Sequence, residues 1–131
     1  MFQVISDPED EPEIPSDIRE SFKTKYKGAK KVEWAIKEDR YKVNFEFDGN
    51  NMFTFLDRHG DWMKSFTKLE KTDLPEAVIN YLDTEYPDYQ LTKLYLKETP
   101  HSKSYTVAVK GKDEYVWLEF NKDGVLLINP A

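Results

Sequence analysis

Apolar residues recur along this chain with two different spacings, and the order of those spacings repeats. Two segments carry an apolar residue at every fourth position, which predicts short helices with one buried stripe. Pro15 and Pro75 suit the first turn of each helix, and Gly28 and Pro87 end them. The stripes are Ile18, Phe22 and Tyr26 in the first segment and Val78, Leu82 and Tyr86 in the second.

After each helix, apolar and polar residues alternate, which is the pattern of strands with one buried face. Strands are predicted at 32–36, 41–47, 52–56 and around Trp62, and again at 91–97, 105–110, 114–120 and 125–128. Glycine-containing segments at 48–50, 58–60, 111–113 and 121–124 fit tight turns between them. Each part of the chain therefore reads as one helix followed by four antiparallel strands.

The two parts also align with each other. Pro15 pairs with Pro75 at an offset of 60 residues, and Gly60 pairs with Gly124 at an offset of 64. The sequence predicts an α+β fold of two tandem helix-plus-four-strand repeats, which form one curved sheet of about eight strands with two helices on one face. The expected single domain covers 14–131, with repeat one at 14–70 and repeat two at 74–131. Residues 1–13, rich in carboxylates and prolines, are expected to form a flexible acidic leader.

Several of these motifs together resemble the PepSY-like family of β-lactamase-inhibitor-like proteins, which is common in Bacteroidetes. The motifs are the helix-opening prolines, the Tyr86-Pro87 pair, the Tyr-x-Val strands at Tyr41 and Tyr105, and the Asp/Asn-x-x-Gly turns at Asp57 and Asn121. The resemblance spans residues 14–128. It implies tandem repeats, a concave sheet face with the helices on the convex side, no known catalysis, and a periplasmic or extracytoplasmic location. Repeat one departs from the pattern, because Lys27 rather than proline follows Tyr26.

Charge and composition disfavour several classes of partner. The chain has 25 acidic and 19 basic residues, a net charge of −6, so it offers no basic excess to neutralise nucleic-acid phosphates. It has no cysteine, and it lacks the run of about 18 apolar residues needed for membrane insertion. Residues 1–5 are too short for a signal peptide, so a cytoplasmic location stays open beside the periplasmic one.

Candidate catalytic and metal-binding groups are sparse. His59 and His101 both fall in predicted turns and lie in no nucleophile or metal-ligand motif, so we expect no catalytic residues, no cofactor and a protein that is not an enzyme. The Asp57 and Asn121 turns resemble the start of a calcium loop, yet the same residues are typical of β-turns. No metal site is predicted, and whether these turns bind an ion stays open.

The face of the sheet away from the helices is the candidate functional surface. If the strands bury one face against the helices, alternation directs another set of aromatic residues to the opposite face, among lysines and glutamates. Aromatic residues mixed with charges are typical of protein-binding surfaces, although cross-strand pairing that stiffens the sheet explains them equally. The candidate partner-binding residues are Phe53, Phe55, Tyr95, Tyr115 and Trp117; Trp62 joins them only if the fourth strand has the register assumed here.

These observations predict a non-enzymatic binding or inhibitor-like module that recognises a protein or peptide through the helix-free sheet face. Two alternatives remain: a small-molecule or carbohydrate-binding domain on the same aromatic residues, or a structural subunit that dimerises through the sheet. We expect a monomer or weak dimer that neither binds nucleic acid nor inserts into a membrane.

Overall fold

The computed structural model describes residues 13–128 and contains two helices and eight strands in the predicted order. The predicted leader, residues 1–13, lies outside the described residues except for Glu13. The elements are α1 (Ser16–Lys25), β1 (Lys30–Lys37), β2 (Arg40–Phe47), β3 (Asn50–Asp57), β4 (Trp62–Lys68), the 3-10 helix η2 (Lys71–Asp73), α2 (Glu76–Glu85), β5 (Gln90–Glu98), β6 (Lys103–Lys110), β7 (Tyr115–Asn121) and β8 (Leu126–Ile128).

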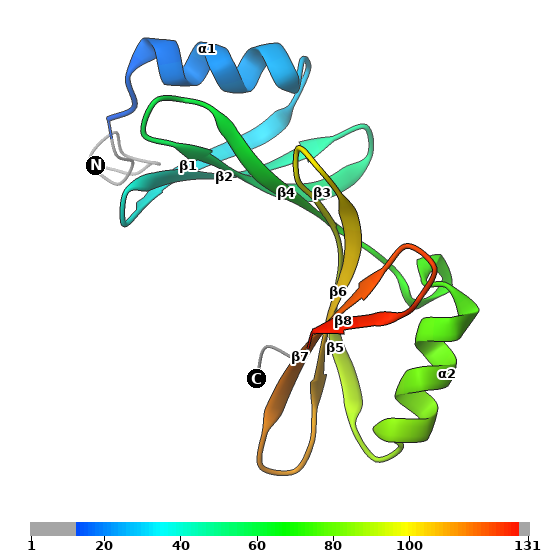
Figure 1. Ribbon diagram of the computed structural model, residues 1–131. Helices are drawn as coiled ribbons and strands as arrows, with labels where there is room; N and C mark the ends of the chain where they lie inside the picture. The colour runs from blue at the N-terminus through cyan, green and yellow to red at the C-terminus, as the bar shows by residue number, and fades with distance from the viewer. Residues whose placement is uncertain (1–12, 129–131) are drawn as a thin grey trace. The chain divides into compact units, whose positions relative to one another are not determined.

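The strands form one antiparallel sheet that does not close, in the order β1 to β8, which confirms the predicted α+β class. By its internal contacts the chain separates into two compact units, Met1–Ser65 and Phe66–Ala131. The division falls inside β4, which therefore contributes residues to both units. It lies ahead of the predicted repeat boundary at residue 70. In Figure 1, α1 lies along one face of β1–β4, and α2 lies along one face of β5–β8.

The two helices begin and end with the same backbone geometry. Pro15 and Pro75 precede them with φ of −57° and −59°, and both supply the carbonyl that the first helical turn needs. At the other end, the Tyr26 and Tyr86 amides each donate to the carbonyl four residues earlier at 2.9 Å. Gly28 follows α1 with φ of +85°, a conformation that glycine adopts at little cost. The helices are therefore structural equivalents at the predicted offset of 60 residues.

Each unit has its own hydrophobic core beneath its helix. In the first unit the α1 stripe packs on Trp34, Val43, Phe45 and Leu56. In the second, the α2 stripe packs on Val107, Val109, Val116, Leu118 and Phe120. Alternation along the strands that carry these core residues places them on the helix side and their immediate neighbours on the opposite, helix-free face.

Two turns press against the helices through glycines. Gly60 and Gly124 have φ of +89° and +87°. A Cβ at Gly60 would lie 3.0 Å from Ile18 Cδ1, and one at Gly124 would lie 2.6 Å from the Ala77 Cβ. Both positions therefore favour glycine for the backbone conformation, and Gly124 also for space.

Candidate functional site

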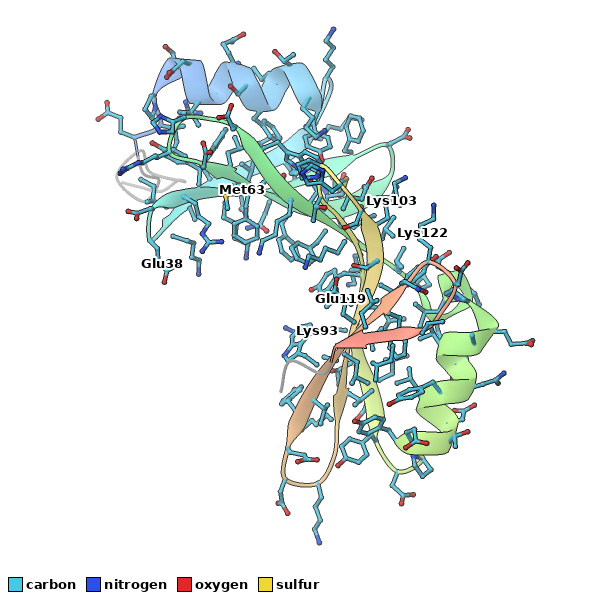
Figure 2. The ribbon with its side chains drawn as sticks, viewed as in Figure 1. Glu38, Met63, Lys93, Lys103, Glu119 and Lys122 are labelled. Carbon is cyan, nitrogen blue, oxygen red and sulfur yellow. The ribbon has the colours of Figure 1, made fainter. Side chains whose placement is uncertain are left out.

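The helix-free face of the second unit is built in rows across three strands. The register pairs Lys93 with Ala108 and Ala108 with Trp117. Because alanine is small, the lysine and the indole meet across it, with Lys93 Nζ 6.0 Å from the Trp117 ring centre. Figure 2 shows the Lys93 side chain projecting away from α2. In the next row Lys110 pairs with Tyr115, and Lys110 Nζ lies 5.7 Å from that ring.

A second set of contacts continues this face along the strands. Tyr95 packs edge-on against Phe66 of β4, with ring centres 5.9 Å apart. Glu119 accepts a 2.6 Å hydrogen bond from Ser104 Oγ, and Lys97 Nζ lies 3.5 Å from the same carboxylate oxygen. Between Tyr95 and Glu119 the register places Thr106, whose buried Oγ1 has no hydrogen-bond partner.

The helix-free face of the first unit carries a compact aromatic pair. Phe53 and Phe55 of β3 meet edge-on with ring centres 6.0 Å apart. Lys42 Nζ lies 4.7 Å from the Phe53 ring, while Lys64 Nζ and Arg40 Cζ lie 5.2 and 5.8 Å from the Phe55 ring. These distances are within the reach of cation–π attraction, which the negative face of each ring provides. The pair is therefore flanked by three cations.

All five predicted residues lie on the helix-free faces, but in two groups. Phe53 and Phe55 belong to the first unit, and Tyr95, Tyr115 and Trp117 to the second. Tyr115 is 54% exposed, whereas the other four are half-buried. Each ring therefore presents only part of its surface to a partner.

Trp62 does not join this surface. Its Nε1 donates to Ser65 Oγ at 2.7 Å, and it packs on the core beneath α1 with Lys25 Nζ 3.8 Å from its ring. Trp62 and Ser65 are three residues apart, yet both lie on the helix side, which strict alternation does not allow. The condition for including Trp62 among the candidate residues is therefore not met.

Sequence reasoning missed Arg40, Lys64 and Phe66 as parts of these faces. Arg40 and Lys64 lie on strands at positions that alternate with core residues, so their side was predictable in principle. Phe66 follows the break in alternation of β4, and its side could not be read from the residues after Trp62. The signal available for Arg40 and Lys64 was a cation at the same alternating positions as the predicted aromatics.

The two Asp/Asn-x-x-Gly segments form equivalent β-turns. Asp57 Oδ1 accepts from the backbone amides of His59 and Asp61 at 2.8 and 3.0 Å, and Asn121 Oδ1 accepts from those of Asp123 and Val125 at 2.9 and 3.0 Å. The Asp61 amide, followed by those of His59 and Gly60, lowers the pKa of Asp57 against a smaller opposing effect of desolvation. These side-chain oxygens therefore hold the backbone of the turn, as predicted for β-turns.

The histidines and the possible metal ligands form no comparable cluster in the described part of the chain. His59 and His101 lie in exposed turns. Within residues 13–128 no group of three or more histidines, aspartates or glutamates is placed to hold a metal ion. In the same part of the chain, no helix has the length and apolar character to cross a bilayer.

Comparison with known proteins identifies relatives by sequence and by fold. The sequence matches the model of a family described as beta-lactamase-inhibitor-like, PepSY-like, over residues 9–55 and 39–128, which confirms the resemblance. No curated protein matches the chain.

Several solved structures from Bacteroides share the fold. A BLIP-like protein from Bacteroides fragilis is 23% identical with a TM-score of 0.80, covering 95% of this chain and 90% of that one. A DUF2874 family protein from Bacteroides uniformis is 22% identical with a TM-score of 0.80, covering 89% and 88%. A protein from Bacteroides eggerthii, provisionally named as periplasmic, is 19% identical with a TM-score of 0.80, covering 90% and 88%. At these identities the likeness establishes the fold alone.

Proposed function

Because this chain belongs to the PepSY-like, β-lactamase-inhibitor-like family, we propose that it is a non-enzymatic binding module that recognises a protein or peptide through its helix-free faces. The observation that carries the proposal is the row of rings and cations on β5–β7. Tyr115 and Trp117 lie two residues apart on β7. Tyr115 lies near Lys110 of the adjacent β6, and Trp117 lies near Lys93 of β5, one strand further across the sheet. Tyrosine and tryptophan are the residues most enriched at binding hot spots.

The cations favour a partner with carboxylates. Lys93 and Lys110 lie beside the rings of the second unit, and Lys42, Lys64 and Arg40 lie beside those of the first, on a chain of net charge −6. A partner carboxylate that approaches a ring there also meets an ammonium group. We therefore propose an acidic protein segment as the partner, with electrostatic attraction setting its orientation and association rate.

The same contacts argue against the carbohydrate alternative. A sugar stacks flat on an open aromatic face. Phe53 and Phe55 meet edge-on, and lysines lie within 4.7 to 5.2 Å of their ring centres. Stacking there requires the ammonium groups to move, whereas an acidic peptide uses both the ring and the charge.

Ring removal tests the proposal. Tyr115→Ala and Trp117→Ala are expected to weaken binding to a captured partner by about tenfold or more each, because hot-spot rings contribute at least about 2 kcal/mol. Immobilised wild-type and variant proteins are compared by quantitative mass spectrometry, and the partner is then purified and titrated calorimetrically.

Ile36→Ala is the matched control. Ile36 is 51% exposed, close to the 54% of Tyr115, but lies on β1 at an alternating position shared with Trp34, on the helix side. A partner lost equally from Ile36→Ala and Tyr115→Ala would reflect general stickiness. If both ring variants stayed folded and kept every partner, the helix-free face would be the wrong surface.

The location is a separate part of the proposal. We place the protein outside the cytoplasm, supported by the neighbour that is provisionally named as periplasmic. Osmotic-shock fractionation of cells that express the native gene measures this directly, and recovery with cytoplasmic markers would refute it.

The oligomeric state is tested separately. Light scattering distinguishes the expected monomer or weak dimer from a structural dimer that forms through the sheet.

A further inference from the structure

A hollow of about 500 Å³ opens in the first unit between the C-terminal half of α1 and strand β1. Phe22, Tyr26 and Trp34 form its aromatic wall. Its size is within the range of about 300–1,000 Å³ that is typical of small-molecule sites. The hollow is thus large enough for an organic ligand, and the three rings at its base are 3 to 8% exposed.

The rim of the hollow is basic. Arg19, Lys23 and Lys27 line it, and none of its lining residues is acidic. Within residues 13–128 no carboxylate forms an ion pair with any of these three cations. Three cations gathered without a carboxylate, on a chain of net charge −6, provide charge complementarity for an anion.

Arg19 is held in place over the wall. Its Nε donates to the Ile14 carbonyl at 3.3 Å, and its Cζ lies 5.8 Å from the Trp34 ring centre. A guanidinium carries further N–H donors in a planar fork that fits a carboxylate, sulfonate or phosphate group. Arg19 therefore lies where it can bind an anionic group attached to an apolar body.

The second unit has the same backbone hydrogen bond at this point but a larger side chain. The Ala29 amide donates to the Tyr26 carbonyl at 3.2 Å, and the Tyr89 amide donates to the Tyr86 carbonyl at 3.2 Å. Tyr89 therefore occupies the position equivalent to Ala29. Its ring packs on Tyr86 with centres 5.0 Å apart, and its hydroxyl donates to Glu114.

The charges differ in the same way. At the predicted offset of 60 residues, Ile79 stands where the first unit has Arg19, and Asp83 stands where it has Lys23. The second repeat therefore has an aromatic ring and an acidic residue at these positions, whereas the first repeat has an alanine and two cations. An open basic hollow is consequently a property of the first repeat's side chains and not a requirement of the fold.

We propose that this hollow binds a small amphipathic organic anion. The apolar or aromatic body lies against Phe22, Tyr26 and Trp34, and one carboxylate, sulfonate or phosphate group lies among the rim cations. A peptide strand added along β1 fits less well. The β1 ladder is irregular between Lys30 and Glu33, and Lys31 has φ of +53°, and a bulged, lysine-bearing edge resists pairing.

The test uses 8-anilinonaphthalene-1-sulfonate and its uncharged analogue N-phenyl-1-naphthylamine as fluorescent probes of the intact chain. The sulfonate is expected to bind saturably, about tenfold more tightly than the neutral probe, because a charge-assisted hydrogen bond adds at least that much. Ala29→Tyr places the second repeat's residue in the hollow and is expected to weaken sulfonate binding at least about tenfold. Arg19→Ile, the second repeat's residue at the other position, is expected to abolish the preference for the charged probe.

Lys112→Ala removes one exposed lysine from a turn of the second unit and should bind both probes like the wild type. Amide chemical shifts locate the probe, and the expected changes centre on Gly28, Ala29 and Val32. If Ala29→Tyr does not fold, the ratio of the two affinities in Arg19→Ile still decides. The proposal is overturned if no saturable binding occurs, if both variants bind like the wild type, or if the shifts cluster around Trp117. Failure here leaves the proposed binding face untouched, because that face is tested by different residues.

Discussion

At the scale of single residues, the buried hydroxyls of two threonines differ in their hydrogen bonding. Thr54 is fully buried, and its Oγ1 donates to the Lys64 carbonyl at 2.9 Å and lies 2.8 Å from Ser65 Oγ. Thr106 Oγ1 is buried without a partner. A buried hydroxyl without a hydrogen bond costs free energy, whereas a bonded one contributes, so the same substitution should change stability in opposite directions.

We expect Thr106→Val to raise the free energy of unfolding by about 1 kcal/mol, because valine keeps the shape and removes the unsatisfied oxygen. Thr54→Val is the control and should lower it by about 1–3 kcal/mol. Denaturant titration followed by circular dichroism measures both. A loss of stability in Thr106→Val equal to that in Thr54→Val would mean that the Thr106 hydroxyl has a partner.

Single residues also mark the limit of sequence prediction. The faces of Phe53, Phe55, Tyr95, Tyr115 and Trp117 follow from a period of two, and the structure places all five as that period requires. The cations that flank the rings were partly visible, but their distances depend on rotamers that the sequence does not specify. The hollow at Ala29 could not be predicted from the sequence, because it exists only where a larger side chain is missing.

At the scale of elements, local patterns predicted almost everything. Both helices and all eight strands lie close to where proline, glycine and alternation place them, and so do the turns that contain glycine. The exception is β4, where Trp62 and Ser65 lie on the same side. The Trp62 indole donates a hydrogen bond to the buried Ser65 hydroxyl, which also bonds to Tyr26 and Thr54. This tertiary network overrides the local period of two.

The turn at residues 121–124 provides a prediction about how a turn docks on a helix. Gly124→Ala should destabilise the protein by roughly 2–4 kcal/mol. The alanine would have to adopt φ of +87°, and its Cβ would lie 2.6 Å from the Ala77 Cβ. Gly49→Ala isolates the backbone cost, because Gly49 has φ of +81° with nothing within 4 Å of its Cβ position. Its expected cost is about 1 kcal/mol.

Thermal or chemical denaturation of the two glycine variants gives the difference, which reports the contact between the turn and α2. Equal losses in Gly124→Ala and Gly49→Ala would show that the helix moves to accept the methyl group. In that case the turn would not fix the position of α2.

At the scale of the whole molecule, the repeat offers two equivalent cores in one chain. Val43 and Val107 occur at the predicted offset of 64, and both are completely buried, each in its own cluster. A unit of about 65 residues buries only about 60% of the surface that its unfolded chain exposes, so it is marginal alone. β4 begins in the first unit and ends in the second. Unfolding of either unit therefore also disrupts part of this shared strand.

We accordingly expect the chain to unfold in one transition. Val43→Ala and Val107→Ala should each lower the free energy of unfolding by roughly 2 kcal/mol, and each should shift the unfolding of both cores together. Amide hydrogen exchange under mild denaturant measures the two cores separately in the same sample, with core amides of β2 and of β6 as reporters. If Val43→Ala accelerated exchange only in β2, the units would be independent folding domains, and the tandem repeat would be a linkage of two domains rather than one cooperative fold.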